Sequence, residues 1–90
     1  MEVRDMPSIC MFYGIIIYLY YEDHMPPHFH ARYQDDIAAF TFDGELLSGT
    51  MPQKQCRLIA AWASIHEAEL EANWSLVSES HEPFRIDPLR

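Results

Sequence analysis

Residues 28–48 read HFHARYQDDIAAFTFDGELLS, and this stretch decides the fold. Residues 28–33 alternate between two sets of side chains, and a period of two is that of a β-strand. A short polar turn leads into residues 37–42, which predict the next strand. Asp43-Gly44 follows, and this dipeptide between apolar runs is typical of a tight hairpin turn. We therefore expect residues 45–48 to return as an antiparallel neighbour.

The residues before this stretch predict further strands. Residues 8–13 and 15–21 are rich in Ile, Tyr and Phe, and Gly14 separates them, so they form two strands or one bent strand. Apolar side chains occupy both faces of residues 15–21, which suits a strand covered on both sides. The small antiparallel sheet is thus expected to have four to five strands within residues 8–50.

The hydrophobic period changes after Thr50. Thr50 and Gln53 have the spacing of a capping box, which marks the start of a helix. Beyond them apolar residues recur every three or four positions, the pattern of a helix with one buried face. Residues 52–80 therefore predict one long helix across one face of the sheet, or two short ones broken near Asn73. Residues 83–90 are expected to pack back as a tail, and the fold class is α+β.

Length and composition limit the possible functions. Ninety residues make one domain, 1–90, and a hydrophobic content of 49% excludes a disordered chain. No apolar run approaches the roughly 20 residues of a membrane helix, and the N-terminus lacks the profile of a secretory signal. A net charge of −8 argues against binding to duplex DNA, which requires clustered Lys and Arg. Cys10 and Cys56 are expected to be reduced thiols, so we expect a cytoplasmic protein.

Three of the five histidines lie in one short segment, Asp23-His24-Met25-Pro26-Pro27-His28-Phe29-His30. The two prolines limit how this backbone bends. His28 and His30 project from the same side of a strand, about 6.5–7 Å apart at Cα, so both reach one metal ion. His24 across the bend completes a three-histidine set for Zn, Fe, Mn or Ni with an open coordination position. Asp23 is then a ligand or the acceptor that orients an imidazole. Alternatively, the three rings only brace the bend.

His66 is a more distant candidate. It lies on the apolar stripe of the predicted helix, where a histidine is usually a core residue with a satisfied hydrogen bond. It approaches the other histidines only if the helix covers that part of the sheet.

The order of charges along the predicted helix is unfavourable. Lys54 and Arg57 lie in its first turns, where the helix dipole disfavours cations. With the strand residue Arg32 they are candidates to face an anionic partner near the helix start. Alternatively, salt and ion pairs with neighbouring acids offset the cost.

Several motifs together resemble one known family. They are Met6-Pro7-Ser8-Ile9, Phe12-Tyr13-Gly14-Ile15, Asp23-His24-x-Pro26-Pro27-His28-Phe29-His30-Ala31, Asp43-Gly44-Glu45, Gly49-x-Met51-Pro52, Trp62 with His66-x-x-Glu69-Leu70, Asn73-Trp74 and Ile86-x-Pro88-Leu89. This set spans nearly the whole chain and resembles the bacterial domain-of-unknown-function 4160 family. The resemblance implies that residues 1–5 are an N-terminal extension. It also implies a gene beside that of another small protein, in the arrangement of a toxin–antitoxin pair.

Two functional hypotheses follow. The first is a toxin–antitoxin-like module component that acts through a small protein partner from the neighbouring gene, and the acidic charge favours a basic partner. The second is a metal-dependent enzyme, a hydrolase or nuclease, that uses His24, His28 and His30. A third interpretation is purely architectural. An exposed sheet edge would also permit a homodimer.

Overall fold

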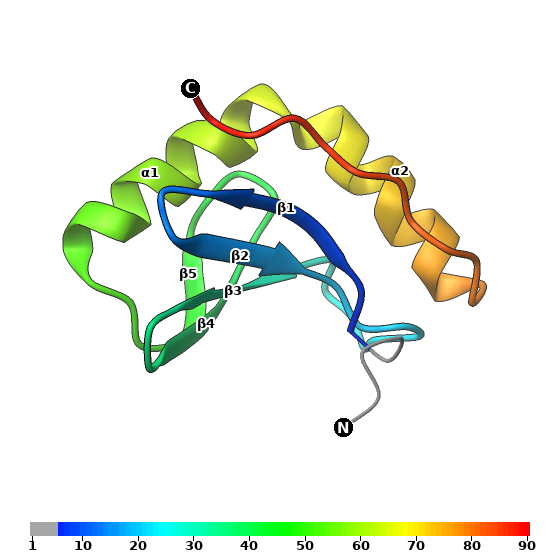
Figure 1. Ribbon diagram of the computed structural model, residues 1–90. Helices are drawn as coiled ribbons and strands as arrows, with labels where there is room; N and C mark the ends of the chain where they lie inside the picture. The colour runs from blue at the N-terminus through cyan, green and yellow to red at the C-terminus, as the bar shows by residue number, and fades with distance from the viewer. Residues whose placement is uncertain (1–5) are drawn as a thin grey trace.

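The sheet consists of five antiparallel strands. The computed structural model describes residues 6–90, and its strands are β1 (Ser8–Phe12), β2 (Ile15–Tyr18), β3 (Phe29–Tyr33), β4 (Asp36–Phe40) and β5 (Leu46–Gly49). They lie in the order β1-β2-β3-β4-β5, so neighbours in the sheet are also neighbours along the chain (Figure 1). The predicted α+β class and antiparallel sheet are confirmed. The predicted extension, residues 1–5, lies outside the described residues.

Strand register assigns each side chain to one face of the sheet. Ala31 in β3 pairs with Ala38 in β4, and both are buried in the core. Their neighbours Arg32 and Ile37 also pair, but both are exposed. Because side chains alternate along a strand, His30 shares a face with Arg32. We call the face that carries His30, Arg32 and Ile37 the open face.

Two helices, α1 (Gln53–Ile65) and α2 (Glu67–Ser78), lie across the other face of the sheet (Figure 1). The prediction of one long helix is wrong, and a break near Asn73 is also wrong. The helical path is interrupted at His66, whose φ is −115° and ψ is 24°. Within residues 6–90, neither helix has the length and apolar character required to cross a membrane.

The break at His66 leaves the buried stripe in phase. Trp62 before it and Leu70 after it are both fully buried. The backbone N–H of His66 still donates to the Trp62 carbonyl at 3.2 Å. Its imidazole Nδ1 lies 2.5 Å from Glu69 Oε1 in the first turn of α2. Since the apolar period continues across the break, periodicity alone does not reveal it.

The start of α1 also differs from the predicted capping box. Its N-cap residue is Pro52, which is extended with ψ 148°, and no side chain caps the helix. Thr50 Oγ1 instead donates to Asp36 Oδ1 at 3.0 Å and connects the end of β5 to the start of β4. Thr50 lies two residues before the N-cap, so its hydroxyl group serves a tertiary contact rather than the helix start.

Aromatic side chains fill the core between the sheet and the helices. The Trp62 ring centroid lies 5.5 Å from that of Phe12 and 5.7 Å from that of Phe29. Phe29 stacks on Phe40 at 5.7 Å. Aromatic pairs at such distances stabilise a core beyond the burial of their surface. The buried Phe29 ring therefore anchors the start of β3, where His28 and His30 flank it.

The predicted tail packs back onto the body and is held by a buried amide. Asn73 of α2 is fully buried, and its Nδ2 donates to the Phe84 carbonyl at 2.8 Å. Its Oδ1 accepts the Phe84 N–H at 2.9 Å. Asn73 is thus a clamp for the tail, which explains why a residue of low helix propensity lies inside α2.

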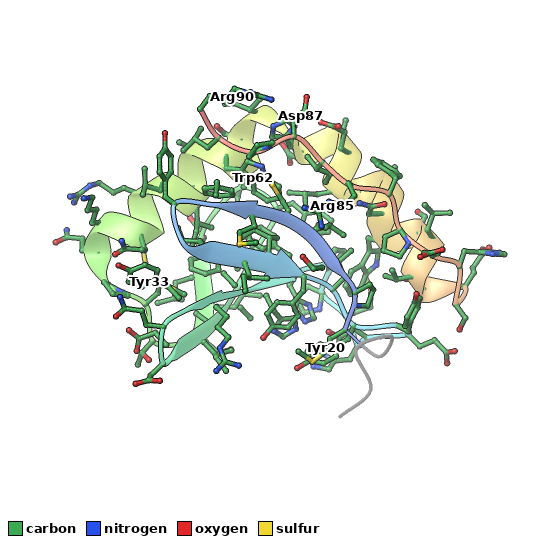
Figure 2. All side chains as sticks on the ribbon, viewed as in Figure 1. Tyr20, Tyr33, Trp62, Arg85, Asp87 and Arg90 are labelled. Atoms are coloured by element: carbon green, nitrogen blue, oxygen red, sulfur yellow. The ribbon has the colours of Figure 1, made fainter. Side chains whose placement is uncertain are left out.

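Further along, the tail joins the helices to the sheet (Figure 1). The Ile86 N–H donates to the Ile9 carbonyl of β1 at 2.9 Å, and Ile86 is 3% exposed. Trp62 Nε1–H donates to the Asp87 carbonyl at 2.8 Å; both residues are labelled in Figure 2. The tail is therefore part of the folded body and occupies the outer side of β1.

Candidate metal centre

The candidate site lies where the β2–β3 connection returns to the sheet. Residues 19–28 leave β2 and pass beside the C-terminal half of α2 before β3 begins (Figure 1). The Glu22 N–H donates to the Val77 carbonyl at 2.9 Å, which attaches the connection to α2. Asp23 follows directly, so this backbone contact also places its carboxylate.

Asp23, His28 and His30 converge on one point. His28 Nε2 lies 2.9 Å from Asp23 Oδ2, and His30 Nε2 lies 3.3 Å from the same oxygen. One ligand atom from each of the three residues lies within 4.8 Å of the other two. The side chains are 12%, 4% and 18% exposed, respectively. We call these three residues the Asp–His–His cluster.

His24 lies outside this cluster. Its side chain is 83% exposed, and its Nε2 is 3.6 Å from Asp23 Oδ1. Its backbone N–H donates to Asp23 Oδ1 at 2.8 Å and helps to orient the carboxylate. The ligand atoms that converge are therefore those of Asp23, His28 and His30, and metal binding by His24, His28 and His30 stays a prediction. The bend directs the His24 ring toward solvent, where its Nδ1 contacts the Met25 carbonyl at 3.1 Å.

A hydrogen bond fixes the tautomer of His28. Its Nδ1 lies 2.6 Å from the Pro26 carbonyl oxygen, which only accepts, so Nδ1 carries the proton. Nε2 of the neutral ring then has a lone pair, and this lone pair faces the Asp23 carboxylate at 2.9 Å. Two acceptors at that distance require a positive species between them. It is either a proton, shared by His28 and Asp23, or a metal ion.

The electrostatics of the cluster favour ionised Asp23 and neutral His30. Burial alone would raise the pKa of Asp23. Two hydrogen bonds, from the His24 amide and from His30, lower that pKa, and the charges of His28 and His30 lower it further. The pKa of Asp23 therefore lies below its ordinary 3.8. Burial lowers the pKa of His30 from its ordinary 6.5; the hydrogen bond to Asp23 opposes this change, and the charge of His28 adds to it. A carboxylate and a neutral imidazole are the forms that bind metals.

Aromatic rings surround the two cluster histidines. Tyr18 of β2 stacks on His30 at 5.4 Å, and the edge of Tyr20 meets the same ring at 4.6 Å. Trp74 of α2 lies 5.4 Å from His28. Figure 2 places Tyr20 at this end of the sheet. Tyr18 was not among the predicted site residues, although it lies opposite His30 in the β2–β3 register. Only the register, set by the long connection, brings them together.

A small pocket adjoins the cluster. Its volume is about 110 Å³, and its lining consists of His24, Pro26, His28, His30, Ala39, Leu47 and Ser48. It lies between the bend and strands β4 and β5. His24 therefore remains a candidate to contact a bound molecule, although it does not join the cluster.

His66 belongs to a different part of the molecule. Its ring contacts Trp62 at 5.5 Å and Glu69 at 2.5 Å, between the two helices. It is absent from the set of converging ligand atoms found within residues 6–90. The expectation of a core histidine with a satisfied hydrogen bond describes this environment.

The three predicted cations do not share one surface. Arg32 is on the open face, where its Nε donates to the Gln34 carbonyl at 3.4 Å, whereas α1 with Lys54 and Arg57 covers the other face. The first turn of α1 contains no acid. Among residues 6–90 no Asp or Glu oxygen lies within 4.0 Å of these three side chains, so the ion pairs considered above are not formed.

Comparison with known proteins identifies the family. A family model described as Domain of unknown function (DUF4160) matches residues 14–75, well over half of the chain. The chain belongs to this family. The matched residues include the whole Asp–His–His cluster, both helices up to Ser75 and the pocket beside the cluster. No curated protein and no solved structure showed a match.

Proposed function

We propose that the Asp–His–His cluster binds a divalent transition metal ion, such as Zn, Fe, Mn or Ni, and that the loaded site catalyses a hydrolytic reaction in the cytoplasm. Two imidazoles and one carboxylate are donors suited to these ions. The observation that carries the proposal is the convergence of one ligand atom each from Asp23, His28 and His30 within 4.8 Å of one another, with His28 Nε2 only 2.9 Å from Asp23 Oδ2. A metal ion would take the place of the proton between His28 and Asp23 and would contact both groups.

The distances in the cluster support the same proposal. A metal ion about 2.0–2.1 Å from each donor separates neighbouring donors by about 3.3 Å in a tetrahedron and about 2.9 Å at a right angle. The distances from Asp23 Oδ2 are 3.3 Å to His30 Nε2 and 2.9 Å to His28 Nε2. Both separations from Asp23 Oδ2 thus suit a shared ion, and the third pair, the two imidazole nitrogens, lies within 4.8 Å.

The surroundings favour catalysis over a purely structural metal site. Three protein ligands leave coordination positions free for water and substrate, and a bound ion supplies an activated water for hydrolysis. The adjacent pocket of about 110 Å³ gives those positions access from the open face. It admits only a small molecule or the end of a larger one, such as a hydrolysable group at a chain terminus.

Metal binding is tested on protein made without a histidine tag and stripped of metal. Calorimetric titration with each of the four ions should give one site per chain. Asp23→Asn and His30→Gln should weaken metal binding at least about tenfold. Loss of a group that only supports a metal ligand already weakens binding by about that factor. His24→Gln is the matched control and should bind as the wild type does. Failure of all four ions to bind, or equal weakening by His24→Gln, would refute the proposal.

The proton alternative is tested on the same sample. Nitrogen NMR of the metal-free protein reports whether His28 is a neutral ring or an imidazolium. If His28 is an imidazolium and no ion displaces its proton, the cluster is an architectural ion pair. If the added ion removes that signal in step with binding, the metal proposal stands.

A second candidate function is supported by the free edge of the sheet. All four residues of β5 are exposed, and Leu46 and Leu47 are 49% and 46% exposed. We propose that a bacterial protein partner adds a strand here, as expected for a toxin–antitoxin-like component that acts through the product of the neighbouring gene. Such an edge also suits a homodimer.

The partner proposal is tested by co-expression with the neighbouring gene product. The pair should elute as one complex in size-exclusion chromatography. Leu46→Lys should prevent complex formation, because a lysine on the edge opposes strand addition. Ile65→Lys, at another exposed apolar position, on α1, is the control. Separate elution of the wild-type pair at micromolar concentration would exclude this function.

A further inference from the structure

A second and larger pocket lies at the opposite end of the sheet from the Asp–His–His cluster. Its volume is about 510 Å³, within the range of about 300–1,000 Å³ typical of small-molecule sites. The β1–β2 turn contributes Tyr13, the end of β3 contributes Tyr33, and α1 and the tail provide the remaining walls. Figure 2 labels Tyr33 on the sheet and Arg90 at the end of the tail, which mark its two sides.

The pocket combines apolar walls with positive charge. Its apolar surface comes from the rings of Tyr13 and Tyr33 and from the leucines Leu58 and Leu89. Lys54 and Arg90 also line it. Rings and leucine side chains suit a flat apolar molecule, whereas the ammonium and guanidinium groups suit an anion.

The side chains that line this pocket carry the charge opposite to that of the whole chain. The sequence has six Lys and Arg against fourteen Asp and Glu, yet two of the six cations and no Asp or Glu side chain line the pocket. Among residues 6–90 no Asp or Glu oxygen lies within 4.0 Å of Lys54 or Arg90. Lys54 also lies in the first turn of α1, where the helix dipole disfavours a cation. Ion pairs with Asp or Glu among residues 6–90 therefore do not account for these positions.

We propose that this pocket binds a small aromatic anion, with its ring between the tyrosine and leucine side chains and its phosphate or carboxylate group at Lys54 and Arg90. Charge-assisted hydrogen bonds from these two side chains would hold the anionic group. Burial of the ring would supply the remaining affinity. The site is independent of the metal centre, because none of its lining residues belongs to the Asp–His–His cluster.

Three probes test the proposal in buffer that contains EDTA, so that metal binding plays no part. The probes are 1-naphthyl phosphate, 1-naphthol and inorganic phosphate, and binding is followed by amide chemical shifts in NMR spectra of the full chain. The naphthyl phosphate should bind at least about tenfold more tightly than either of the others, since it alone engages both parts of the pocket. Shift changes should centre on Tyr33, Gln55 and Leu58.

Variants of α1 separate this site from general surface charge. Lys54→Gln should weaken the binding of 1-naphthyl phosphate about tenfold, which is the effect of losing one charge-assisted hydrogen bond. Arg57→Gln removes the same charge from an exposed position outside the lining and should have no effect. Equal binding of inorganic phosphate would mean an adventitious ion only, and equal binding of 1-naphthol would mean unspecific apolar contact. Either result, or equal weakening by the two variants, would overturn the proposal.

Discussion

Replacement of Asn73 by alanine should loosen the tail and lower the stability of the whole chain. The amide makes two hydrogen bonds with the Phe84 peptide, at 2.8 and 2.9 Å, from a fully buried position. Each such bond contributes about 0.5–1.5 kcal/mol, so Asn73→Ala should cost about 2 kcal/mol. For a domain of this size, that loss lowers the melting temperature by roughly 8–16 °C.

Thermal unfolding followed by circular dichroism measures this effect, and hydrogen exchange of the Phe84 and Ile86 amides locates it. Asn73→Asp keeps the acceptor for the Phe84 N–H but loses the donor, so it should also destabilise the chain. Ser75→Ala, an exposed position on the same helix, is the control and should melt as the wild type does. A shift of less than about 3 °C for Asn73→Ala would show that the clamp contributes little and would refute the reasoning.

Three further predictions concern the cluster and the packing of the chain. Because the folded-state pKa values of His30 and Asp23 lie below their ordinary values of 6.5 and 3.8, the unfolded chain takes up each proton first as pH falls. Urea unfolding of the metal-free protein should therefore show that the free energy of unfolding declines below about pH 6.5 and again below about pH 3.8. His30→Leu should abolish the first decline. If the first decline persists in that variant, a group other than His30 causes it. Gly49→Ala should lower the free energy of unfolding by more than about 2 kcal/mol in the same assay. Its φ is +86°, and an added Cβ would lie 2.3 Å from the Ile37 carbonyl oxygen. A variant as stable as the wild type would contradict that geometry. Trp62→Phe loses the Nε1–H group that donates to the tail. It should speed hydrogen exchange of the tail amides and lower the free energy of unfolding by about 1–2 kcal/mol. Unchanged exchange would show that this hydrogen bond does not hold the tail.

The sheet was largely predictable because its signals are local. Alternation over residues 28–33 and the Asp43-Gly44 pair each depend on neighbouring residues, and β3 and β5 follow with shifts of one residue. The predicted strand 15–21 is longer than β2, because Leu19 onward joins the connection. Apolar content alone does not distinguish an ordered strand from an apolar loop packed on the core.

The helical half was predicted less well because tertiary contacts decide it. His66 interrupts the helix while the buried stripe continues, and Thr50 bonds Asp36 instead of the helix end. A break near Asn73 is one of the two predicted alternatives, yet the Asn73 amide lies inside α2 and binds the tail. The contacts of Thr50 with Asp36 and of Asn73 with Phe84 join residues far apart in the chain, so no local pattern predicts them.

In the candidate site, too, local features were predictable from the sequence and tertiary ones were not. The spacing of His28 and His30 correctly predicted neighbouring rings, whose centroids lie 5.0 Å apart. The exclusion of His24 and the inclusion of Asp23 depend on the path of the bend, and that path is set partly by the bond from Glu22 to α2. The candidate residues were therefore predictable from residue identity, whereas the set that converges required the fold.

The two outer strands of the sheet are not equivalent. The tail binds the outer carbonyl of Ile9 in β1, whereas β5 has no further strand beside it in the part of the chain that the structure describes. A chain with one accessible edge adds a strand once and then offers no second edge. Two copies joined through β5 would form a closed pair, because unlimited growth into fibres requires a second complementary surface. The exposed leucines of β5 therefore carry little risk of open-ended aggregation as long as the tail stays in place.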